Sequence, residues 1–338
     1  MSLTANTARR RHPRTKSTVG SGRIKLSQNW RERLETLVGG YSANTIRCYR
    51  ADFAIFEAWC RQEGRTALPA TPETVAAFVL AQSKSAAPAT VSRRRAGIAK
   101  IHRLLNLDSP VSTVEVNLAT RTVFRQKGRR QDQALGLTGT LKQKLISACP
   151  ADLQGLRDRA LIAVGYDTLC RRAELVQLRV DDLTVKLDGS GTILVRKSKA
   201  DQFGDGRLAY LSPEALSHLQ RWLRAANLNT GPIFRGIRGA QLMPDALHPY
   251  SVARVLKDLA RDAGLEKALI AKLSGHSMRV GAAQDMAAAG IDLGAIMHAG
   301  GWKSPDMVMR YIEHMEVGKS GMARLYGNGQ ETTMNQHN

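Results

Sequence analysis

The chain has 338 residues, and its 50 Lys and Arg against 29 Asp and Glu give a formal net charge of +21. This length suits two domains with substantial cores, and no apolar run approaches the roughly 20 residues that span a bilayer. So large a positive excess favours a polyanion such as nucleic acid as the partner, with solubility alone as the alternative.

Residues 1–24 are polar and basic, with almost nothing to bury, so we expect a disordered arm that either follows DNA phosphates or is only a solvated tail. Residues 25–127 have apolar positions at helical spacing and predict an all-helical domain. The expected helices lie near 27–38, 42–63, 72–84, 87–106 and 112–126. The aromatic residues of the second helix, Phe53, Phe56 and Trp59 among them, are predicted to be core.

Two of these helices present arginine together with Asn or Ser near their N-terminal ends, which is suitable equipment for reading a DNA major groove. A solvated basic face is the alternative. The candidate DNA contacts here are Asn44, Arg47, Arg50, Ser92, Arg93 and Arg94. Arg121, Arg125, Arg129 and Arg130 continue the basic character into residues 128–134, which we interpret as a linker laid along a phosphate backbone.

Residues 135–327 are predicted to form a mixed α/β domain. Helices are expected near 138–148 and 153–169, with a short helix opening at Arg171, and further helices near 213–226 and 248–264. Two β segments, 192–196 and 208–211, predict a small hairpin whose turn includes Asp205-Gly206. The 248–264 helix has a basic face that includes Arg254, a further candidate DNA contact.

Residues 273–314 predict three short helices. Ser274 is the expected N-cap of the first, which Gly290 closes, and Asp292 caps the second, which ends at Gly300 and Gly301. Ser304-Pro305-Asp306 is a strong start for the third, with Tyr311 about two turns into it.

The cysteines Cys48, Cys60, Cys149 and Cys170 show no paired metal-ligand spacing, and the N-terminus has no signal-peptide apolar region. We expect reduced thiols, no metal and no cofactor, in a cytoplasmic or nucleoid-associated protein. Residues 321–326 form a short apolar, amphipathic segment, and 328–338 are a polar tail expected to be disordered.

His276 and Arg279 lie three residues apart, so on a helix they share a face that suits a bound anion. A lone H-x-x-R is weak, but here it is followed by Gly300-Gly301-Trp302 and by the proline-started helix that carries Tyr311. With the stretches SGHSMRVGAA, AGGW and MRYI at these spacings, the chain resembles the tyrosine site-specific recombinases of the phage integrase family. Residues 168–175, TLCRRAEL, and 197–199, KSK, are similar to the family's first arginine motif and to the end of its lysine-bearing strand.

The resemblance implies a mainly α fold with a small β-hairpin, arranged as a two-domain DNA clamp of an all-helical core-binding domain and a mixed α/β catalytic domain. It also implies site-specific recombination with a 3′-phosphotyrosyl intermediate formed by Tyr311. Arginine is always charged and binds phosphate through two donors, so Arg171 and Arg279 are expected to stabilise the phosphate without a metal. His276 would assist proton movement, Lys199 would be the general acid, Trp302 would donate its indole N–H, and Glu174 would orient Arg171 or His276.

The extra Arg172 and Lys197 leave open which neighbouring cation faces the phosphate. The resemblance further implies four protomers on two inverted-repeat sites, resolution of a Holliday junction, and docking of residues 318–326 into a neighbouring protomer. A type IB topoisomerase-like nicking and resealing enzyme keeps the same chemistry without strand exchange. A non-catalytic, sequence-specific DNA-binding regulator is the alternative from another class.

Overall fold

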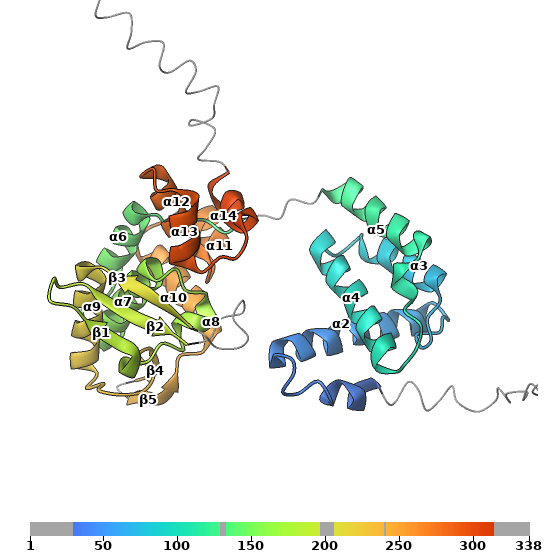
Figure 1. The fold of residues 1–338 in the computed structure, drawn as a ribbon, viewed down its shortest axis with the longest axis horizontal. Helices are drawn as coiled ribbons and strands as arrows, with labels where there is room; N and C mark the ends of the chain where they lie inside the picture. The colour runs from blue at the N-terminus through green and yellow to red at the C-terminus, as the bar shows by residue number, and fades with distance from the viewer. Residues whose placement is uncertain (1–29, 129–132, 197–205, 240, 314–338) are drawn as a thin grey trace, which may run out of the picture. The chain divides into compact units, whose positions relative to one another are not determined.

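The computed structural model describes residues 30–128, 133–196, 206–239 and 241–313. The chain divides into two compact units, Met1–Gln131 and Asp132–Asn338 (Figure 1). Within the described ranges, no helix combines the length and apolar character needed to cross a membrane.

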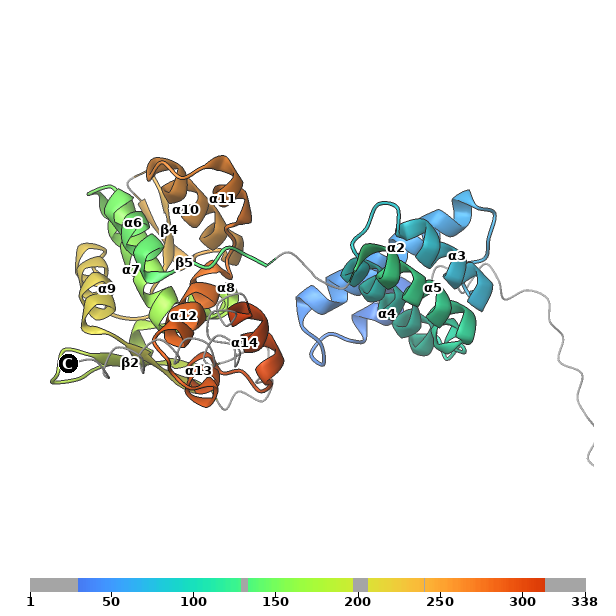
Figure 2. The same ribbon diagram turned by 90° about the horizontal axis from the view of Figure 1, so that it is seen from above.

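The first unit is helical throughout its described part (Figure 2). After helical residues 30–35 come α2 (Ala43–Gln62), α3 (Pro72–Gln82), α4 (Pro88–Leu104), the 3₁₀ turn Pro110–Ser112 and α5 (Val114–Lys127). Local signals set these starts, because the Ser42 and Thr71 side chains accept from the backbone N–H groups of Thr45 and Thr74. The helical pattern expected for this part of the chain is confirmed.

The core of this unit is built on the apolar side of α2. Phe53 and Phe56 are fully buried, and their rings meet edge to face at 5.7 Å. His102 is also fully buried and hydrogen-bonded on both nitrogens: Nε2 accepts from Ala70 N at 3.0 Å, and Nδ1 lies 2.8 Å from the Ile98 carbonyl oxygen. Burial lowers the pKa of His102, which therefore is a neutral core residue.

The second unit combines helices with two small sheets. Its elements are α6 (Gly139–Ala148), α7 (Leu153–Asp167), α8 (Arg172–Leu175), the 3₁₀ turn Val180–Asp182, β1 (Leu183–Val185), β2 (Gly191–Val195), β3 (Arg207–Leu211), α9 (Pro213–Ala225), β4 (Arg235–Arg238), β5 (Gln241–Ala246), α10 (Pro249–Asp262), α11 (Lys267–Lys272), α12 (Ser277–Ala288), α13 (Leu293–Gly300) and α14 (Pro305–Ile312). The expected hairpin is confirmed as β2–β3, which pairs antiparallel with Ile193 opposite Ala209. The sequence did not predict β1, β4, β5 or α11.

The segment around Gly136 and Leu137, which precedes α6, packs closely against α12. Leu137 N donates to the Ser277 carbonyl oxygen at 2.7 Å, and a Cβ on Gly281 would stand 2.0 Å from the Leu137 oxygen. A Cβ on Gly136 would likewise collide with the side chain of Gln284. Glycine at 136 and 281 therefore permits the close approach of backbone to helix.

The last three helices follow the expected punctuation, with one correction. Asp292 and Ser304 cap α13 and α14 through their side chains, and Gly301 ends α13 in the left-handed region at φ +64°. Ser274, however, does not cap α12, which begins at Ser277 with His276 in the cap position. Ser274 instead forms a tight turn, in which its Oγ accepts from His276 N and its N–H donates to Ser277 Oγ. His276 thus precedes the helix that carries Arg279.

Candidate active site

Arg279 occupies the centre of a cluster that α8, α12, α13 and α14 contribute to. Its side chain is 1% exposed, and Nη1 donates to the carbonyl oxygens of Leu169 and, at 2.8 Å, of Gly300. The guanidinium carbon lies 3.8 Å from the centre of the Trp302 ring. Nη2 is buried and has no hydrogen-bond partner among the described residues. Burial, followed by the charge of Arg171, lowers the pKa of Arg279 to about 10.

Arg171 is held in place by Glu174, as expected from their spacing. The Glu174 carboxylate, 5% exposed, accepts from the Arg171 backbone N–H at 3.0 Å and from its Nη1 at 2.7 Å. The adjacent Arg172 lies over Tyr250, with its guanidinium 4.5 Å from the centre of that ring, and its charge also acts on His276. The charge of Arg171 lowers the pKa of Arg279, whereas the charge of Arg172 lowers that of His276. This geometry favours Arg171 as the partner of Arg279.

His276 stands beside three positive charges. Desolvation first, and then the charges of Arg279, Arg172 and Arg171, lower its pKa below the ordinary value. The imidazole is therefore neutral at pH 7 and able to accept a proton. Such a base next to guanidinium groups suits chemistry at an anionic centre.

Tyr311 and Trp302 complete the cluster. Both are largely buried, and their rings meet edge to face with centroids 6.0 Å apart. The backbone carbonyl of Tyr311 accepts from the side-chain amides of Gln284, at 3.1 Å, and Gln133, at 3.4 Å. These contacts fix the main chain of α14 at the residue that carries the phenol.

Lys199 and its neighbour Lys197 lie outside the described residues. Strand β2, which precedes them, is described. Its last residue, Val195, and the following Arg196 line a cavity of about 180 Å³ together with Glu174. Arg196 is anchored by Asp182, whose carboxylate oxygens lie 2.8 and 3.0 Å from its Nε. The end of β2 is thus fixed next to the carboxylate that holds Arg171.

Arg207, the first residue of β3, belongs to this region although no sequence motif pointed to it. Its Nη2 donates to the Thr168 carbonyl oxygen at 2.6 Å, and its Nη1 donates to that of Ala299 at 3.0 Å. Its charge is also among those that act on Arg279. No local pattern marks this residue, because its partners lie 39 and 92 positions away in the chain.

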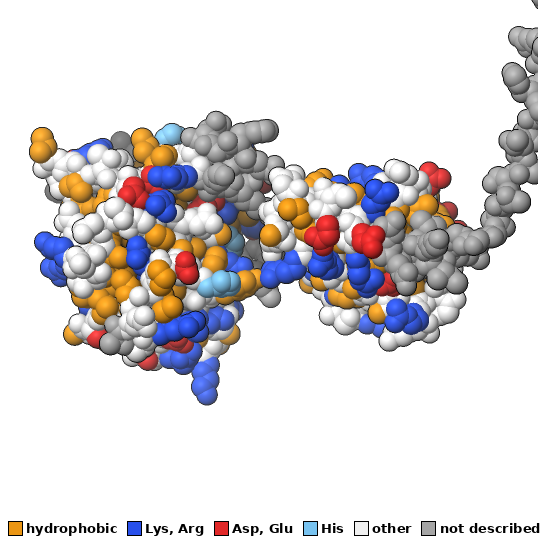
Figure 3. All heavy atoms as spheres, turned by 90° about the horizontal axis from the view of Figure 1, so that it is seen from below, with side chains coloured by type: hydrophobic (Ala, Val, Ile, Leu, Met, Phe, Trp, Pro, Cys, Tyr) orange, Lys and Arg blue, Asp and Glu red, His pale blue; other side chains and the backbone are white. Residues whose placement is uncertain are grey.

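In the first unit, the candidate DNA contacts on α2 form an exposed row. Asn44, Arg47 and Arg50 are all exposed; Arg47 donates to Asn44 Oδ1 at 2.6 Å, and Arg50 pairs with Glu35. Lys and Arg side chains gather in groups on the visible face of each unit, with fewer Asp and Glu (Figure 3). The three side chains thus lie on the solvent-exposed side of α2.

The candidates on α4 differ from one another. Arg93 is half exposed and forms a two-point contact with the buried carboxylate of Asp52, at 2.8 and 2.9 Å. The Arg94 side chain is only 16% exposed and donates to Gln82, so its guanidinium is used within the unit. Ser92 is half-buried, whereas Arg121 and Arg125 on α5 are exposed. Arg129 and Arg130 lie outside the described residues.

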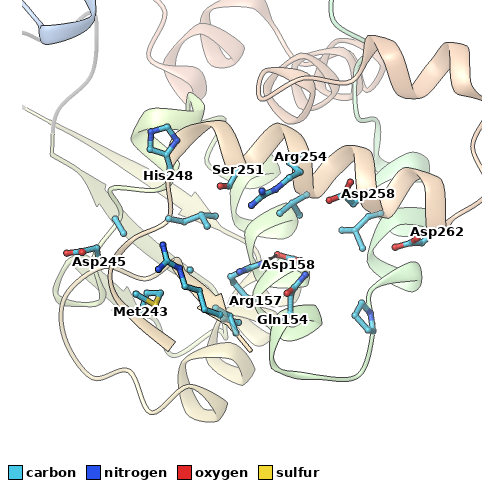
Figure 4. Close-up of a pocket in the computed structure, with 18 residues that line it drawn as sticks. Gln154, Arg157, Asp158, Met243, Asp245, His248, Ser251, Arg254, Asp258 and Asp262 are labelled. Atoms are coloured by element: carbon cyan, nitrogen blue, oxygen red, sulfur yellow. Dashed lines mark hydrogen bonds and ion pairs between the residues drawn. The ribbon is translucent and has the colours of Figure 1, made fainter. Parts of the chain in front are cut away.

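Arg254 lines a cavity of about 560 Å³ between α7, α10 and the β4–β5 hairpin. Figure 4 shows Ser251, Arg254, Asp258 and Asp262 along α10, with Arg157 and Asp158 opposite them on α7. Acidic and basic groups alternate around this cavity, and none of the residues of the Arg279 cluster lines it. Arg254 thus shares this cavity with the carboxylates of Asp158, Asp258 and Asp262.

Comparison with protein families gives two matches that together span most of the described chain. Residues 137–316 match the phage integrase family, and residues 30–107 match the phage integrase N-terminal SAM-like domain.

Individual relatives agree with these matches. An integrase/recombinase xerD homolog of Selenomonas ruminantium is 34% identical over 317 residues, covering 89% of this chain and 90% of the relative. The recombinase cre of Escherichia phage P1 is 28% identical over 308 residues, covering 86% and 89%.

The fold is shared with solved structures of low sequence identity. The site-specific recombinase XerH bound to a palindromic difH substrate gives a TM-score of 0.61 at 18% identity, covering 87% of this chain and 85% of that one. A lambda integrase dimer bound to a core site gives 0.58 at 16% identity, covering 84% and 76%.

Proposed function

Because this chain belongs to the phage integrase family, whose tyrosine recombinases cleave and rejoin DNA, we propose that it is a site-specific recombinase with Tyr311 as its nucleophile. The observation that carries this proposal is the buried Nη2 of Arg279, which has no partner among the described residues. A buried donor on a charged group is costly unless something accepts from it. A non-bridging phosphate oxygen is the natural acceptor for a guanidinium in this setting.

The proposed reaction begins with attack of the Tyr311 phenol oxygen on a DNA phosphorus. A bond forms between this oxygen and phosphorus, the bond from phosphorus to the 5′-oxygen breaks, and a 3′-phosphotyrosyl linkage results. Neutral His276 assists removal of the phenol proton, and Lys199 protonates the departing 5′-oxygen. Attack by a 5′-hydroxyl reverses these steps and releases Tyr311, so the bond energy is conserved and ATP is not required.

Arg171, Arg279 and Trp302 stabilise the charge that builds on the non-bridging oxygens. Arg171 is preorganised by Glu174, and the contacts of Arg279 and Trp302 hold both groups before DNA arrives. Removing one preorganised donor of this kind lowers a rate by on the order of 10²–10³. The two guanidinium groups do the work that a metal ion performs in many nucleases.

At the level of assembly, we infer a tetramer on two inverted-repeat sites that exchanges strands through a Holliday junction. The proposed DNA contacts are the exposed row on α2 with Arg93, Arg121 and Arg125, and the segment near 318–326 is the proposed link between protomers. The protein would act in the cytoplasm, associated with the nucleoid. XerH on its palindromic difH substrate and the lambda integrase dimer on its core site support DNA contact by analogy of fold.

Covalent trapping from a random library tests the proposal and identifies the target sequence in one experiment. The protein is incubated with a library of random-sequence duplexes, denatured with detergent, and the DNA that stays attached is sequenced. We expect attached duplexes that share an inverted repeat, a free 5′-hydroxyl at the break, and no loss of attachment in chelator. Tyr311→Phe should attach none yet still bind the recovered duplex; equal attachment by this variant would refute the assignment of the nucleophile.

A plasmid with two copies of the recovered sequence then distinguishes recombination from its alternatives. A recombinase yields deletion or inversion products and a four-way junction intermediate. Relaxation of plasmid that lacks the sequence, without recombinant products, would indicate a topoisomerase-like enzyme. Sequence-specific binding that never produces an adduct would indicate a regulator.

A further inference from the structure

Arg207 connects two backbone segments that lead directly into the proposed catalytic groups. Its Nη2 donates to the Thr168 carbonyl oxygen at 2.6 Å, and its Nη1 donates to the Ala299 carbonyl oxygen at 3.0 Å. The first of these segments continues into Arg171 and the second into Trp302. Nη2 also lies 3.6 Å from Cys170 Sγ, so the guanidinium of Arg207 is held within this region by two main-chain acceptors and one side chain.

Arg279 joins the same two segments one residue further along each. Its Nη1 donates to Leu169 and Gly300, the residues that follow the two partners of Arg207. The two arginines therefore form consecutive crosslinks between the end of α7 and the end of α13. Two crosslinks fix both the separation of the segments and their relative rotation, whereas one would fix only the separation.

The first segment is one that needs to be held. Leu169 has φ +50° and is buried, a backbone conformation that a residue with a branched side chain rarely adopts unless its surroundings impose it. The carbonyl groups on either side of its α-carbon are the ones that the two guanidinium groups bind. At the second segment, a cation at the C-terminal end of α13 is favoured by the helix dipole.

The two arginines use their N–H donors differently. Arg279 uses Nη1 for both carbonyl groups and leaves Nη2 without a partner among the described residues. If Arg207 were absent, Arg279 alone would hold the segments, and the direction of Nη2 would follow their motion. With Arg207 present, the two segments are held in place, and the direction of Nη2 is held with them.

We propose that Arg207 is a positioning residue for strand cleavage, which holds the segments before Arg171 and Trp302 in register so that Arg279 presents Nη2 to the phosphate. This proposal rests on the proposed function of Tyr311 and Arg279. A displacement of about 1 Å at a reacting group can lower a rate by on the order of 10², so the effect of losing Arg207 should appear in the cleavage rate.

The chain contains a matched control in Arg235. Arg235 is also the first residue of a strand, β4, and is half-buried like Arg207. Its Nε and Nη2 likewise donate to two backbone carbonyl oxygens, those of Pro232 and Thr230, each at 3.0 Å. These partners belong to a local turn, so Arg235 has the same kind of structural role without the connection to the catalytic groups.

The experiment compares Arg207→Met, Arg207→Lys, Arg235→Met and the unsubstituted full-length protein. The substrate is the duplex recovered by covalent trapping, and three quantities are measured: the single-turnover rate of adduct formation, the Kd for DNA, and the thermal unfolding midpoint. We expect Arg207→Met to form adduct about 10²-fold more slowly, with Kd within about threefold of the unsubstituted value. Arg207→Lys, which keeps the charge and can reach one carbonyl group, should recover about tenfold of that loss. Arg235→Met should cleave within about twofold of normal, whatever its midpoint.

Each outcome decides the matter. If Arg207→Met and Arg235→Met cleave equally fast, Arg207 is only a structural contact and the proposal is wrong. If Arg207→Met fails to fold, Arg207→Lys carries the test, and a normal cleavage rate for that variant at an unchanged midpoint would overturn the need for two crosslinks. If the unsubstituted protein forms no adduct, the proposed function fails together with this inference.

Discussion

In the part of the chain that the structure describes, the buried guanidinium of Arg279 has no carboxylate partner, and the Arg279→Met variant tests whether it serves the reaction more than the fold. Its pKa of about 10, against roughly 12.5 for a free side chain, corresponds to about 3 kcal/mol against the charged form in the folded protein. That cost is present throughout the range below pH 10, because folding lowers the pKa. Two hydrogen bonds from Nη1 to backbone carbonyl oxygens offset it, at about 1.5–3 kcal/mol for each bond to a charged group.

The two effects nearly cancel, so Arg279→Met should change the free energy of unfolding by no more than about 2 kcal/mol. Cleavage should fall by on the order of 10³ or more, because the variant lacks the donor that meets the phosphate. The free energy is measured by urea titration of the full-length protein and the rate by single-turnover adduct formation. A loss of activity without a comparable loss of stability is the expected signature.

Arg157→Met is the matched control, because Arg157 is also buried but has a carboxylate partner. Its Nη2 lies 2.7 Å from Asp158 Oδ1, and both side chains are nearly inaccessible to solvent. Removing one member of a buried ion pair typically costs about 3–5 kcal/mol. The reasoning is refuted if Arg279→Met destabilises the protein as much as Arg157→Met, or if it cleaves within tenfold of the unsubstituted protein.

Glu174→Gln should slow adduct formation about tenfold, since an amide replaces the carboxylate that accepts twice from Arg171; an unchanged single-turnover rate would contradict this. Because desolvation and nearby arginines lower the pKa of His276, the acid limb of adduct formation should lie below the ordinary histidine value of about 6.5, and Arg172→Met should shift this limb to higher pH in a pH–rate series. A limb that stays in place would exclude the charge of Arg172 as a cause. Burial lowers the pKa of His102. The contribution of neutral His102 to the free energy of unfolding is therefore fully present above the pKa of the unfolded chain, near 6.5, and is lost as the pH falls below it. The unfolding midpoint of His102→Gln should therefore drop less between about pH 7.5 and pH 5 than that of the unsubstituted protein, and an equal drop would count against a neutral His102.

Local signals explain what could be predicted of the fold. The starts of α13 and α14 follow from Asp292 and Ser304, each of which satisfies a backbone N–H within three residues. The aromatic residues of α2 repeat at helical spacing, and Phe53 and Phe56 are indeed core. In these cases the residues that determine an element lie within that element or next to it in the sequence.

The elements that were missed lack such signals. Strand β1 has three residues, and β5 is mostly exposed and contains Pro244, a residue that strands seldom accommodate. The predicted N-cap at Ser274 was wrong because Ser274 N–H donates to Ser277 Oγ and Ser277 N–H donates to the Ser274 carbonyl oxygen. These two bonds form a turn, and α12 therefore begins two residues later than expected. Pairing with β2 and β4 determines the two strands, whereas local hydrogen bonds determine the start of α12.

The candidate site divides in the same way. The cluster of Arg171, His276, Arg279, Trp302 and Tyr311 was expected from ordered motifs, and the structure brings these five residues together. The bond between the guanidinium of Arg207 and two distant carbonyl groups is a product of the folded chain alone. Sequence motifs identify the residues proposed to act on the substrate. The contacts that orient these residues join positions far apart in the chain, so no local pattern predicts them.

The close fit of residues 133–137 against α12 bears on the design of chimeras. Gln133 binds the main chain of Tyr311, and Leu137 binds Ser277, so this stretch is part of the catalytic unit although it adjoins the boundary at Gln131. A graft of a foreign DNA-binding half should be joined upstream of Gln133 and should retain Gly136 and Gly281. Fusions joined further downstream would leave α14 without the contact from Gln133 to the Tyr311 carbonyl oxygen.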